Sequence, residues 1–348
     1  MLNHGPEHIV GGMFGLAEPL QPAPAPPPFL TKEAILLANG RSGIALAIER
    51  LAPATVWLPS FFCNHLLQTI GEGRTPVRLY GIGADLAPRD WEWLGDVSPG
   101  DLVVVVDYFG FPCDPAWLQR LRRRGAVVLE DASQALLSDG VGRCADLVLY
   151  SPRKFVGVPD GGILVPVRGR IASDQPLEPA PETWWLTCRS AALKRREFDR
   201  SGGDRYWFEL FRQAEQEGPT GPYAMSELSR QLLFQGFDYG EIARQRIANY
   251  RYLASLLADL ALFPVLPDGV VPLGFPVRVG QRDRLREELF RHGIYPPLHW
   301  PLQGVVPERF RESHRLSAEI MTLPCDQRYD QDDMARMANI INGQLKRC

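Results

Sequence analysis

The sequence has little of several features that would place it in a special class of protein. No apolar run is long enough to span a bilayer, and the longest in the middle of the chain is LVVVV at residues 102–106. The formal net charge is only −3, so composition indicates no polyanionic partner such as nucleic acid. No basic stretch followed by an apolar one begins the chain, so we expect no signal peptide. These absences favour a soluble globular protein without a membrane or nucleic-acid partner.

Cysteine is also scarce, with six residues scattered through 348. No CxxC pair occurs and no Cys/His spacing suits zinc, so we expect no metal site. Reduced cysteines favour a cytoplasmic location. What is present is ordinary: 45% hydrophobic and 23% charged residues are typical of a globular protein, and the length suffices for about two domains.

The first 29 residues differ in composition from the rest. Residues 1–29 are expected to form an arm containing IVGGMFGLAEP and then a proline-rich tether, PLQPAPAPPP (19–28). The GGMFGL part of the arm either closes over a functional site or pads a subunit contact. Beyond the tether, residues 30–237 are predicted to form a large α/β domain and residues 238–348 a smaller α+β domain.

Apolar and amphipathic segments alternate in the large domain. Strands are predicted at TVWLP, PVRLYG, DLVVVVDYFG, AVVLED, DLVLYS and GGILVPV. Helices are predicted at SGIALAIERL, NHLLQTIGEG and DPAWLQRLRRRG, with Ser42 placed to cap the first of them. This alternation is typical of βαβ units and of a mainly parallel sheet covered by helices on both faces.

Two segments could bind parts of a ligand. ANGRSGIALA (38–47) begins a helix with glycine, serine and glycine, where free N–H groups and the helix dipole suit a phosphate, although many helices begin this way without a ligand. AVVLEDASQA (126–135) ends a buried strand in Asp131. Ligands of open α/β sheets bind outside the carboxyl ends of strands, so Asp131 is placed to hold a cation, a metal or a protonated ring nitrogen. The alternative for Asp131 is a cap on a following helix.

A third segment, DLVLYSPRKFVGVPDGG (146–162), ends the next strand with Ser151 and Lys154. A lysine in such a crevice is partly desolvated and its amine can act as a nucleophile, whereas a solvated surface lysine is the alternative. Gly161 and Gly162 permit a positive φ or a close backbone approach. A phosphate seat, a strand-end acid and a strand-end lysine are together what pyridoxal 5′-phosphate (PLP) requires, since it needs an anchor, a partner for its ring nitrogen and a Schiff-base lysine.

On these stretches the chain resembles the DegT/DnrJ/EryC1/StrS family of PLP-dependent sugar aminotransferases. Further matching stretches bring the resemblance to most of residues 38–340: VWLPSFFCN, YAMSELSRQLL, ARQRIANYRYLASLL, HGIYPPLHWPL and IMTLPCDQRYDQDDMARM. The resemblance implies fold type I, a mainly parallel seven-stranded sheet sandwiched by helices with a smaller C-terminal α+β domain. It also implies a homodimer with active sites at the interface.

The family's activity would be the transfer of an amino group from an amino acid, glutamate in most members, to a keto sugar that is nucleotide-linked. Such reactions serve cell-surface polysaccharide or secondary-metabolite biosynthesis. By the same resemblance, Lys154 would form the Schiff base and act as acid and base in the 1,3-proton shift. Asp131 would pair with the pyridinium nitrogen.

The remaining family roles fall on the same segments. Ser133 would pack near the ring face and Gln134 would lie beside the polar edge of the cofactor. Ser42, with the amides of Ser42 and Gly43, would hold the phosphate. The PPLHWP loop makes His299 and Trp300 candidates for substrate contact, with loop packing as the alternative.

The chain departs from the family pattern around the phosphate and the ring. Leu149 stands where the family often has a serine, and Ser151 is the candidate to replace it. The stacking aromatic aligns with Cys63, next to Phe62. The family's Asn-Tyr-Arg-Met, which reaches the partner's phosphate, is here PYAM, beginning at Pro222.

Other outcomes stay open at this stage. They are a fold-type-I PLP enzyme with another reaction, such as a dehydratase, and a PLP-binding homologue without turnover. Family dehydratases replace the lysine with histidine, and this chain keeps Lys154, so transamination is favoured. Ser151 and Lys154 also fit the Ser-x-x-Lys of penicillin-binding hydrolases, but the Ser-Asp-Asn and Lys-Thr-Gly companions are absent.

Overall fold

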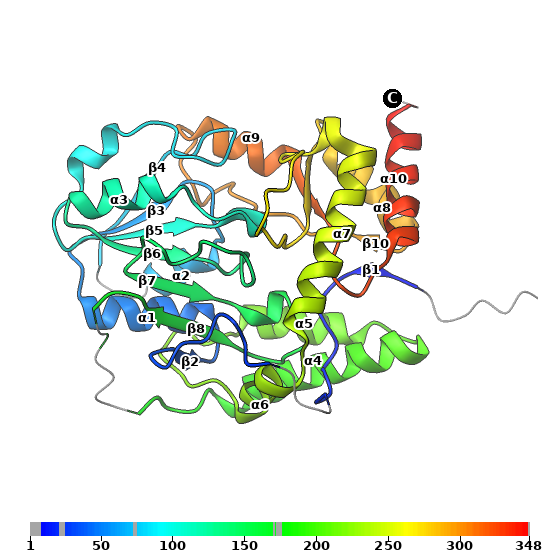
Figure 1. The fold of residues 1–348 in the computed structure, drawn as a ribbon, viewed down its shortest axis with the longest axis horizontal. Helices are drawn as coiled ribbons and strands as arrows, with labels where there is room; N and C mark the ends of the chain where they lie inside the picture. The colour runs from blue at the N-terminus through cyan, green and yellow to red at the C-terminus, as the bar shows by residue number, and fades with distance from the viewer. Residues whose placement is uncertain (1–7, 21–24, 72–74, 170, 172–175, 347–348) are drawn as a thin grey trace, which may run out of the picture.

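A seven-stranded sheet forms the centre of the large domain in a computed structural model that describes residues 8–20, 25–71, 75–169, 171 and 176–346. Residues 21–24 of the predicted tether lie outside the described residues. The strand order is β2-β8-β7-β6-β5-β3-β4 (Figure 1). The strands are β2 (Ile35–Leu37), β3 (Val56–Pro59), β4 (Val77–Tyr80), β5 (Leu102–Val106), β6 (Val127–Asp131), β7 (Leu147–Tyr150) and β8 (Gly162–Pro166).

The sheet is mainly parallel, as predicted. β4, β3, β5, β6 and β7 pair in parallel, whereas β8 runs antiparallel to β7 and β2 antiparallel to β8. Every residue of β5 is buried, which is the pattern of a strand covered on both faces. The fold class predicted from the sequence is confirmed.

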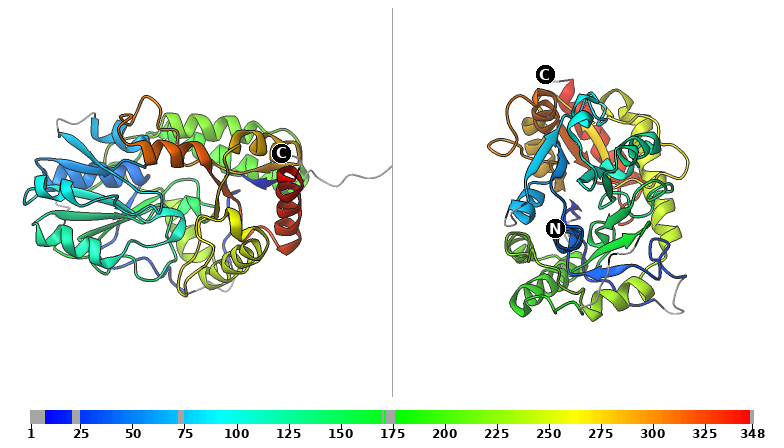
Figure 2. Two further views of the ribbon diagram at one scale, coloured as in Figure 1. Left: turned by 90° about the horizontal axis from the view of Figure 1, so that it is seen from above. Right: turned by 90° about the vertical axis from the view of Figure 1, so that its left-hand side faces the viewer.

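Helices connect these strands. The α-helices of this part are α1 (Gly40–Leu51), α2 (His65–Gly71), α3 (Pro115–Arg123), α4 (Glu182–Ser201), α5 (Tyr206–Gln216) and α6 (Glu227–Gln235), and the 3-10 helices are η1 (Glu92–Asp96), η2 (Tyr108–Gly110) and η3 (Pro152–Lys154). The step β3–α2–β4 moves across the sheet in one direction and β5–α3–β6 in the other. Because such crossovers are right-handed, α2 and α3 cover opposite faces, as the views in Figure 2 also show.

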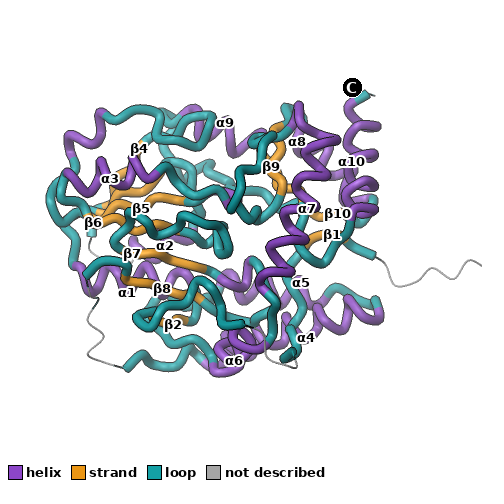
Figure 3. The backbone as a smooth tube through the Cα atoms, in the orientation of Figure 1, coloured by secondary structure: helices purple, strands orange, loops and turns teal. Residues whose placement is uncertain are grey.

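The rest of the chain forms a second group of elements. Its elements are α7 (Tyr239–Leu257), η4 (Ala258–Leu260), β9 (Phe275–Arg278), α8 (Arg282–Arg291), β10 (Ile294–Tyr295), α9 (Arg311–Glu319), β11 (Ile320–Leu323) and α10 (Gln331–Leu345). Most of them lie to one side of the large sheet, whereas the helix α9 lies near β4 (Figure 3). β9 pairs with β11, and β10 pairs in parallel with β1 (Val10–Gly11) of the N-terminal arm. The arm is therefore built into the C-terminal part of the chain.

Two hydrophobic cores follow this division only in part. The larger core contains the sheet strands but also Tyr239 and Ile242 of α7, together with Leu302, Val306, Leu316 and Ile320. The second core contains Val10 together with Tyr250, Leu253 and Leu257 of α7 and buried apolar side chains of α8 and α10. Among the described residues, no helix combines the length and the apolar character needed to cross a bilayer.

Candidate active site

The sheet topology determines where a crevice opens. β3 and β5 are neighbours, but the chain leaves them in opposite directions, to β4 and to β6. At such a switch point the loops beyond the strands diverge, and ligands of open α/β sheets bind there. Cys63 follows β3, Tyr108 and Phe109 follow β5, Asp131 ends β6 and Lys154 follows β7.

The start of α1 differs from the prediction in one respect. Asn39, not Ser42, is the N-cap, because the Asn39 side chain accepts a hydrogen bond of 2.8 Å from the Ser42 backbone N–H. Ser42 is fully buried, and its Oγ has no hydrogen-bond partner among the described residues. A buried hydroxyl without a partner is costly, so this atom fits a ligand oxygen at the helix start.

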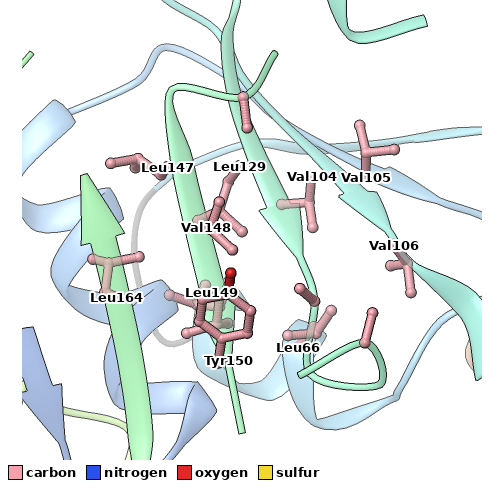
Figure 4. Packing of buried hydrophobic residues seen from close by; sticks show 14 of the residues in the cluster. Leu66, Val104, Val105, Val106, Leu129, Leu147, Val148, Leu149, Tyr150 and Leu164 are labelled. Atoms are coloured by element: carbon pink, nitrogen blue, oxygen red, sulfur yellow. The ribbon is translucent and has the colours of Figure 1, made fainter. Parts of the chain in front are cut away.

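Small residues bring the helix start against the sheet. A Cβ built on Gly40 would lie 4.0 Å from the Ser133 Oγ, and one on Gly43 would lie 2.5 Å from the Leu149 Cδ1. Leu149 lies among the buried apolar side chains of β7 and its neighbours (Figure 4). The predicted phosphate seat therefore has an apolar side chain where the family often has a hydroxyl.

Both uses predicted for the paired glycines are confirmed. Gly161 has a φ of +143°, and its N–H donates to the Ala38 carbonyl at 2.7 Å. A Cβ on Gly162 would overlap the carbonyl of Asn39. β8 thus holds the start of α1 in place through its backbone.

Asp131 is half-buried at the end of β6, and its Oδ1 accepts a hydrogen bond from the Ser133 N–H at 3.0 Å. Residues 132–146, all of them described, contain no helix. The alternative that Asp131 caps a following helix is therefore wrong. The bond to Ser133 fixes the carboxylate and leaves its second oxygen for a ligand, because no other hydrogen bond to the Asp131 side chain occurs among the described residues.

Gln134 is nearly completely buried below the same loop. Its Oε1 accepts the Phe109 N–H at 2.7 Å. Phe109 has a φ of +58°, a strained conformation for a non-glycine residue that this bond helps to hold. Since the carbonyl of Gln134 is engaged, its amide nitrogen is the end left for a ligand.

Lys154 is half-buried rather than solvated. Its amine has no hydrogen bond or ion pair to the described residues, but its charge acts on nearby groups. Burial raises the pKa of the Cys63 thiol, Lys154 partly offsets this and Asp131 adds to it. The charges of the amine and the carboxylate thus both act on Cys63, as expected of an acid and a lysine that follow adjacent strands.

Residues from the C-terminal part hold the turn that carries Lys154. The carbonyl of Phe155 accepts hydrogen bonds from Gln327 Nε2 at 2.7 Å and from Arg246 Nη2 at 3.4 Å. Arg246 is fully buried, with its guanidinium 4.4 Å from the centre of the Phe155 ring. The sequence predictions missed this clamp, because its residues lie more than 90 positions from Phe155.

The N-terminal arm packs beside the same turn. The Ala17 N–H donates to the Gly157 carbonyl at 2.8 Å, and a Cβ on Gly157 would overlap the Gly15 carbonyl. Arg328 donates to the carbonyls of Met13 and Gly12. The GGMFGL segment (residues 11–16) thus packs against its own chain. Its contact at Gly157 lies three residues after Lys154 in the sequence.

His299 and Trp300 reach the carboxyl ends of the central strands. The Trp300 ring lies 5.3 Å from the Phe61 ring, and the His299 ring lies 5.5 Å from the Phe109 ring. His299 Nδ1 lies 2.9 Å from the Thr322 hydroxyl. Burial, assisted by repulsion from the Lys154 amine, lowers the pKa of His299 to about 3, so this imidazole is neutral at physiological pH.

Three other predicted residues lie around the crevice. Phe62 is fully buried in the large core, whereas Cys63 beside it is half-buried. Ser151 is buried at the start of η3, where its carbonyl accepts the Lys154 N–H. The segment that begins at Pro222 bonds to the strand before α1, through the carbonyl of Tyr223 and the N–H of Ala38.

A crevice with this topology and these groups defines the chain as a PLP-dependent transferase of fold type I. The profile of the "DegT/DnrJ/EryC1/StrS aminotransferase family" matches residues 99–342, and the chain belongs to this family. It is therefore a PLP-dependent aminotransferase that acts on small-molecule substrates.

Solved structures show the same fold at low identity. The aminotransferase TlmJ from Streptoalloteichus hindustanus has a TM-score of 0.65 and 20% identity, over 90% of this chain and 86% of that one. PseC from Helicobacter pylori has a TM-score of 0.67 and 16% identity, over 91% and 88%. The PLP form of Spr1654 from Streptococcus pneumoniae has a TM-score of 0.65 and 15% identity, over 89% and 86%. None of the curated protein sequences matches this chain.

Proposed function

We propose that this aminotransferase moves an amino group from an amino acid, with glutamate as the donor, to a nucleotide-linked keto sugar. The observation that carries the proposal is the half-buried Lys154 near Asp131, in the crevice that also holds the unpartnered Ser42 hydroxyl. The choice of a sugar is supported by relatives of the same fold. Spr1654 is a putative sugar aminotransferase, and PseC is an aminotransferase of pseudoaminic acid biosynthesis.

The residues present fit the cofactor. Ser42 Oγ and the amides of Ser42 and Gly43 would hold its phosphate at the positive end of α1. Asp131 would hold a proton on the ring nitrogen through its second carboxylate oxygen, and the Gln134 amide would donate to the polar edge. When bound, PLP supplies a ring that withdraws electrons from the substrate.

The other predicted residues take supporting places in the proposal. Lys154 would bond covalently to the cofactor and move a proton between the substrate carbon and the cofactor carbon that flank the transferred nitrogen, which requires an amine without a competing ion pair. Ser133 and Cys63 would contact the ring faces, with Phe62 packing behind Cys63. Ser151 would approach the phosphate from η3.

The substrate and the assembly are inferred from exposed or neutral groups. His299 is neutral and Trp300 aromatic, which suits hydrogen bonding and stacking against a sugar. A homodimer with its active sites at the interface is supported by exposed apolar side chains on α4 and α5, namely Leu186, Tyr206 and Phe208. A cytoplasmic location is supported by the free state of the five described cysteines.

The test uses purified protein reconstituted with PLP. We expect a visible absorption band that borohydride bleaches, and its conversion to the pyridoxamine spectrum on addition of glutamate. Subsequent addition of keto sugars, free and nucleotide-linked, should restore the first spectrum and yield an amino sugar detectable by mass spectrometry. A band that no amino donor converts would contradict transamination and favour a different PLP reaction or a protein without turnover.

A further inference from the structure

Two arginines without a role in the proposed function lie beside the site, joined by one acid. The Arg153 Nη1 lies 2.5 Å from the Glu215 Oε1, and the Arg41 Nη2 donates to the Glu215 carbonyl at 3.1 Å. Arg41 belongs to the first turn of α1, next to Ser42, and Arg153 precedes Lys154 in η3. Glu215 of α5 therefore ties together the two elements that supply the phosphate seat and the reactive lysine.

The two guanidiniums have donors left over. A guanidinium carries five N–H donors, and among the described residues Arg41 uses one hydrogen bond and Arg153 one ion pair. A Cβ on Gly218 would overlap the Arg41 Nη2, so this guanidinium lies directly against the backbone at Gly218. This contact and the hydrogen bond to the Glu215 carbonyl together restrain Arg41.

The surroundings of the Arg153–Glu215 ion pair reduce the screening of its charges by water. Arg153 and Glu215 line a cavity of about 30 Å³ together with Met13 and Phe14 of the arm. A cavity of that size holds about one water. Because Met13 and Phe14 line it, the arm covers this side of the ion pair with apolar side chains. In such a place an unpaired charge is less screened and favours a counter-ion.

The group has more positive than negative charge. Burial opposes the ionisation of Glu215, but Arg153 outweighs it and the pKa of this carboxyl lies below its ordinary value. Burial lowers the pKa of His65, as does repulsion from Arg41, so His65 adds no charge. Arg41 and Arg153 thus share the single charge of Glu215 as their common contact.

We propose that Arg41 and Arg153 form an oxyanion seat beside Lys154, with Glu215 holding the two guanidiniums at a fixed separation. The planar forks of arginine match phosphate and carboxylate groups. The oxyanion comes either from the cofactor phosphate or from a carboxylate of the amino donor. The place of this seat in the active site rests on the proposed function. The seat supplies a positive charge from within the chain, whereas the family's arginine is here replaced by Ala224.

Titrations of wild type, Arg41→Gln and Arg153→Gln separate the two sources, with the exposed Arg123→Gln on α3 as the matched control. If the seat binds the cofactor phosphate, the Kd for PLP rises about 10- to 100-fold in both variants, while the Kd for pyridoxal, which lacks the phosphate, stays unchanged. If it binds the donor, PLP affinity is retained and the glutamate concentration for half-conversion rises by a similar factor, with a smaller rise for alanine. Unchanged values in both titrations would overturn the seat.

Two further measurements keep the test decisive. If Arg41→Gln does not fold, as judged by thermal unfolding, Arg41→Lys keeps the charge without the fork and should show an intermediate loss. If wild type forms no absorption band with PLP, the proposed function fails, and calorimetric titration with inorganic phosphate and glutarate then tests the seat alone. Binding by wild type that is lost in both variants supports the seat, and equal or absent binding rejects it.

Discussion

The Leu149 side chain fills the space beside Gly43, so that a Cβ built on Gly43 would lie 2.5 Å from the Leu149 Cδ1. Gly43 is part of the α1 turn proposed to hold the phosphate, and Leu149 is almost fully buried on β7. The close approach exists because one residue lacks a side chain and the other is branched and apolar. It fixes the distance between the helix start and the sheet.

This contact predicts a coupled pair of substitutions. Gly43→Ala should lower the free energy of unfolding by about 1–3 kcal/mol, because the new methyl group overpacks against Leu149. Leu149→Ala alone should cost about 2–5 kcal/mol through the cavity it leaves. The double variant should lose less than the sum, since the methyl group then enters that cavity. Urea unfolding of the four proteins measures the coupling, and strictly additive losses would show that the two residues do not meet.

The second prediction concerns the amine. Lys154→Ala should abolish the visible band and the borohydride-stable attachment of the cofactor, and reduce turnover by at least about 10²–10⁴-fold, the range for loss of a positioned acid-base group. Absorbance, mass spectrometry after reduction and steady-state assays report these effects. The exposed Lys194→Ala serves as the control. Retention of the attached mass in Lys154→Ala would mean that another lysine holds the cofactor.

The third prediction concerns the acid. Asp131→Asn keeps an oxygen for the Ser133 N–H but removes the charge proposed to face the ring nitrogen. We expect PLP still to bind and turnover to fall about 10- to 100-fold, which corresponds to loss of a hydrogen bond to a charged group. Asp131→Glu, which retains the charge on a longer side chain, should recover part of the rate. Wild-type turnover in Asp131→Asn would be incompatible with the assigned role.

The fourth prediction is a pH dependence of stability. The pKa of His299 is lowered to about 3 by burial and by Lys154, whereas in the unfolded chain it is about 6.5. Below pH 6.5 the imidazole of His299 therefore binds a proton in the unfolded chain but stays unprotonated in the folded protein. His299 lowers stability as the pH falls from 6.5 towards 3, by up to about 1.4 kcal/mol per pH unit.

Urea unfolding between pH 7 and pH 5 measures this effect. His299→Gln should flatten the decline, and the exposed His292→Gln provides the matched control for the change of residue type. An identical decline in wild type and His299→Gln would place the imidazole in a solvated environment.

Much of the large domain could be predicted from the sequence because its signals are local. Runs such as LVVVV at 102–106 are apolar throughout, as strands buried on both faces must be. The glycine pair at 161–162 was interpretable because positive φ and close backbone approach both require glycine. Asp131 and Lys154 were found for the same reason, since each ends a recognisable strand and parallel strands end at one edge.

Other features were decided only by the tertiary structure. Asn39 rather than Ser42 caps α1, because the cap depends on the backbone conformation before the helix, and this frees the Ser42 hydroxyl. Arg41, Arg153 and Glu215 meet from three elements, and no local pattern marks the acid as their partner. Gln327 and Arg246 clamp Phe155 from the other end of the chain. The sequence by itself thus determined the helices and strands and the acid and lysine that follow β6 and β7. Contacts between distant residues were decided by tertiary packing, because no periodicity in a sequence encodes which remote side chain fills a given space.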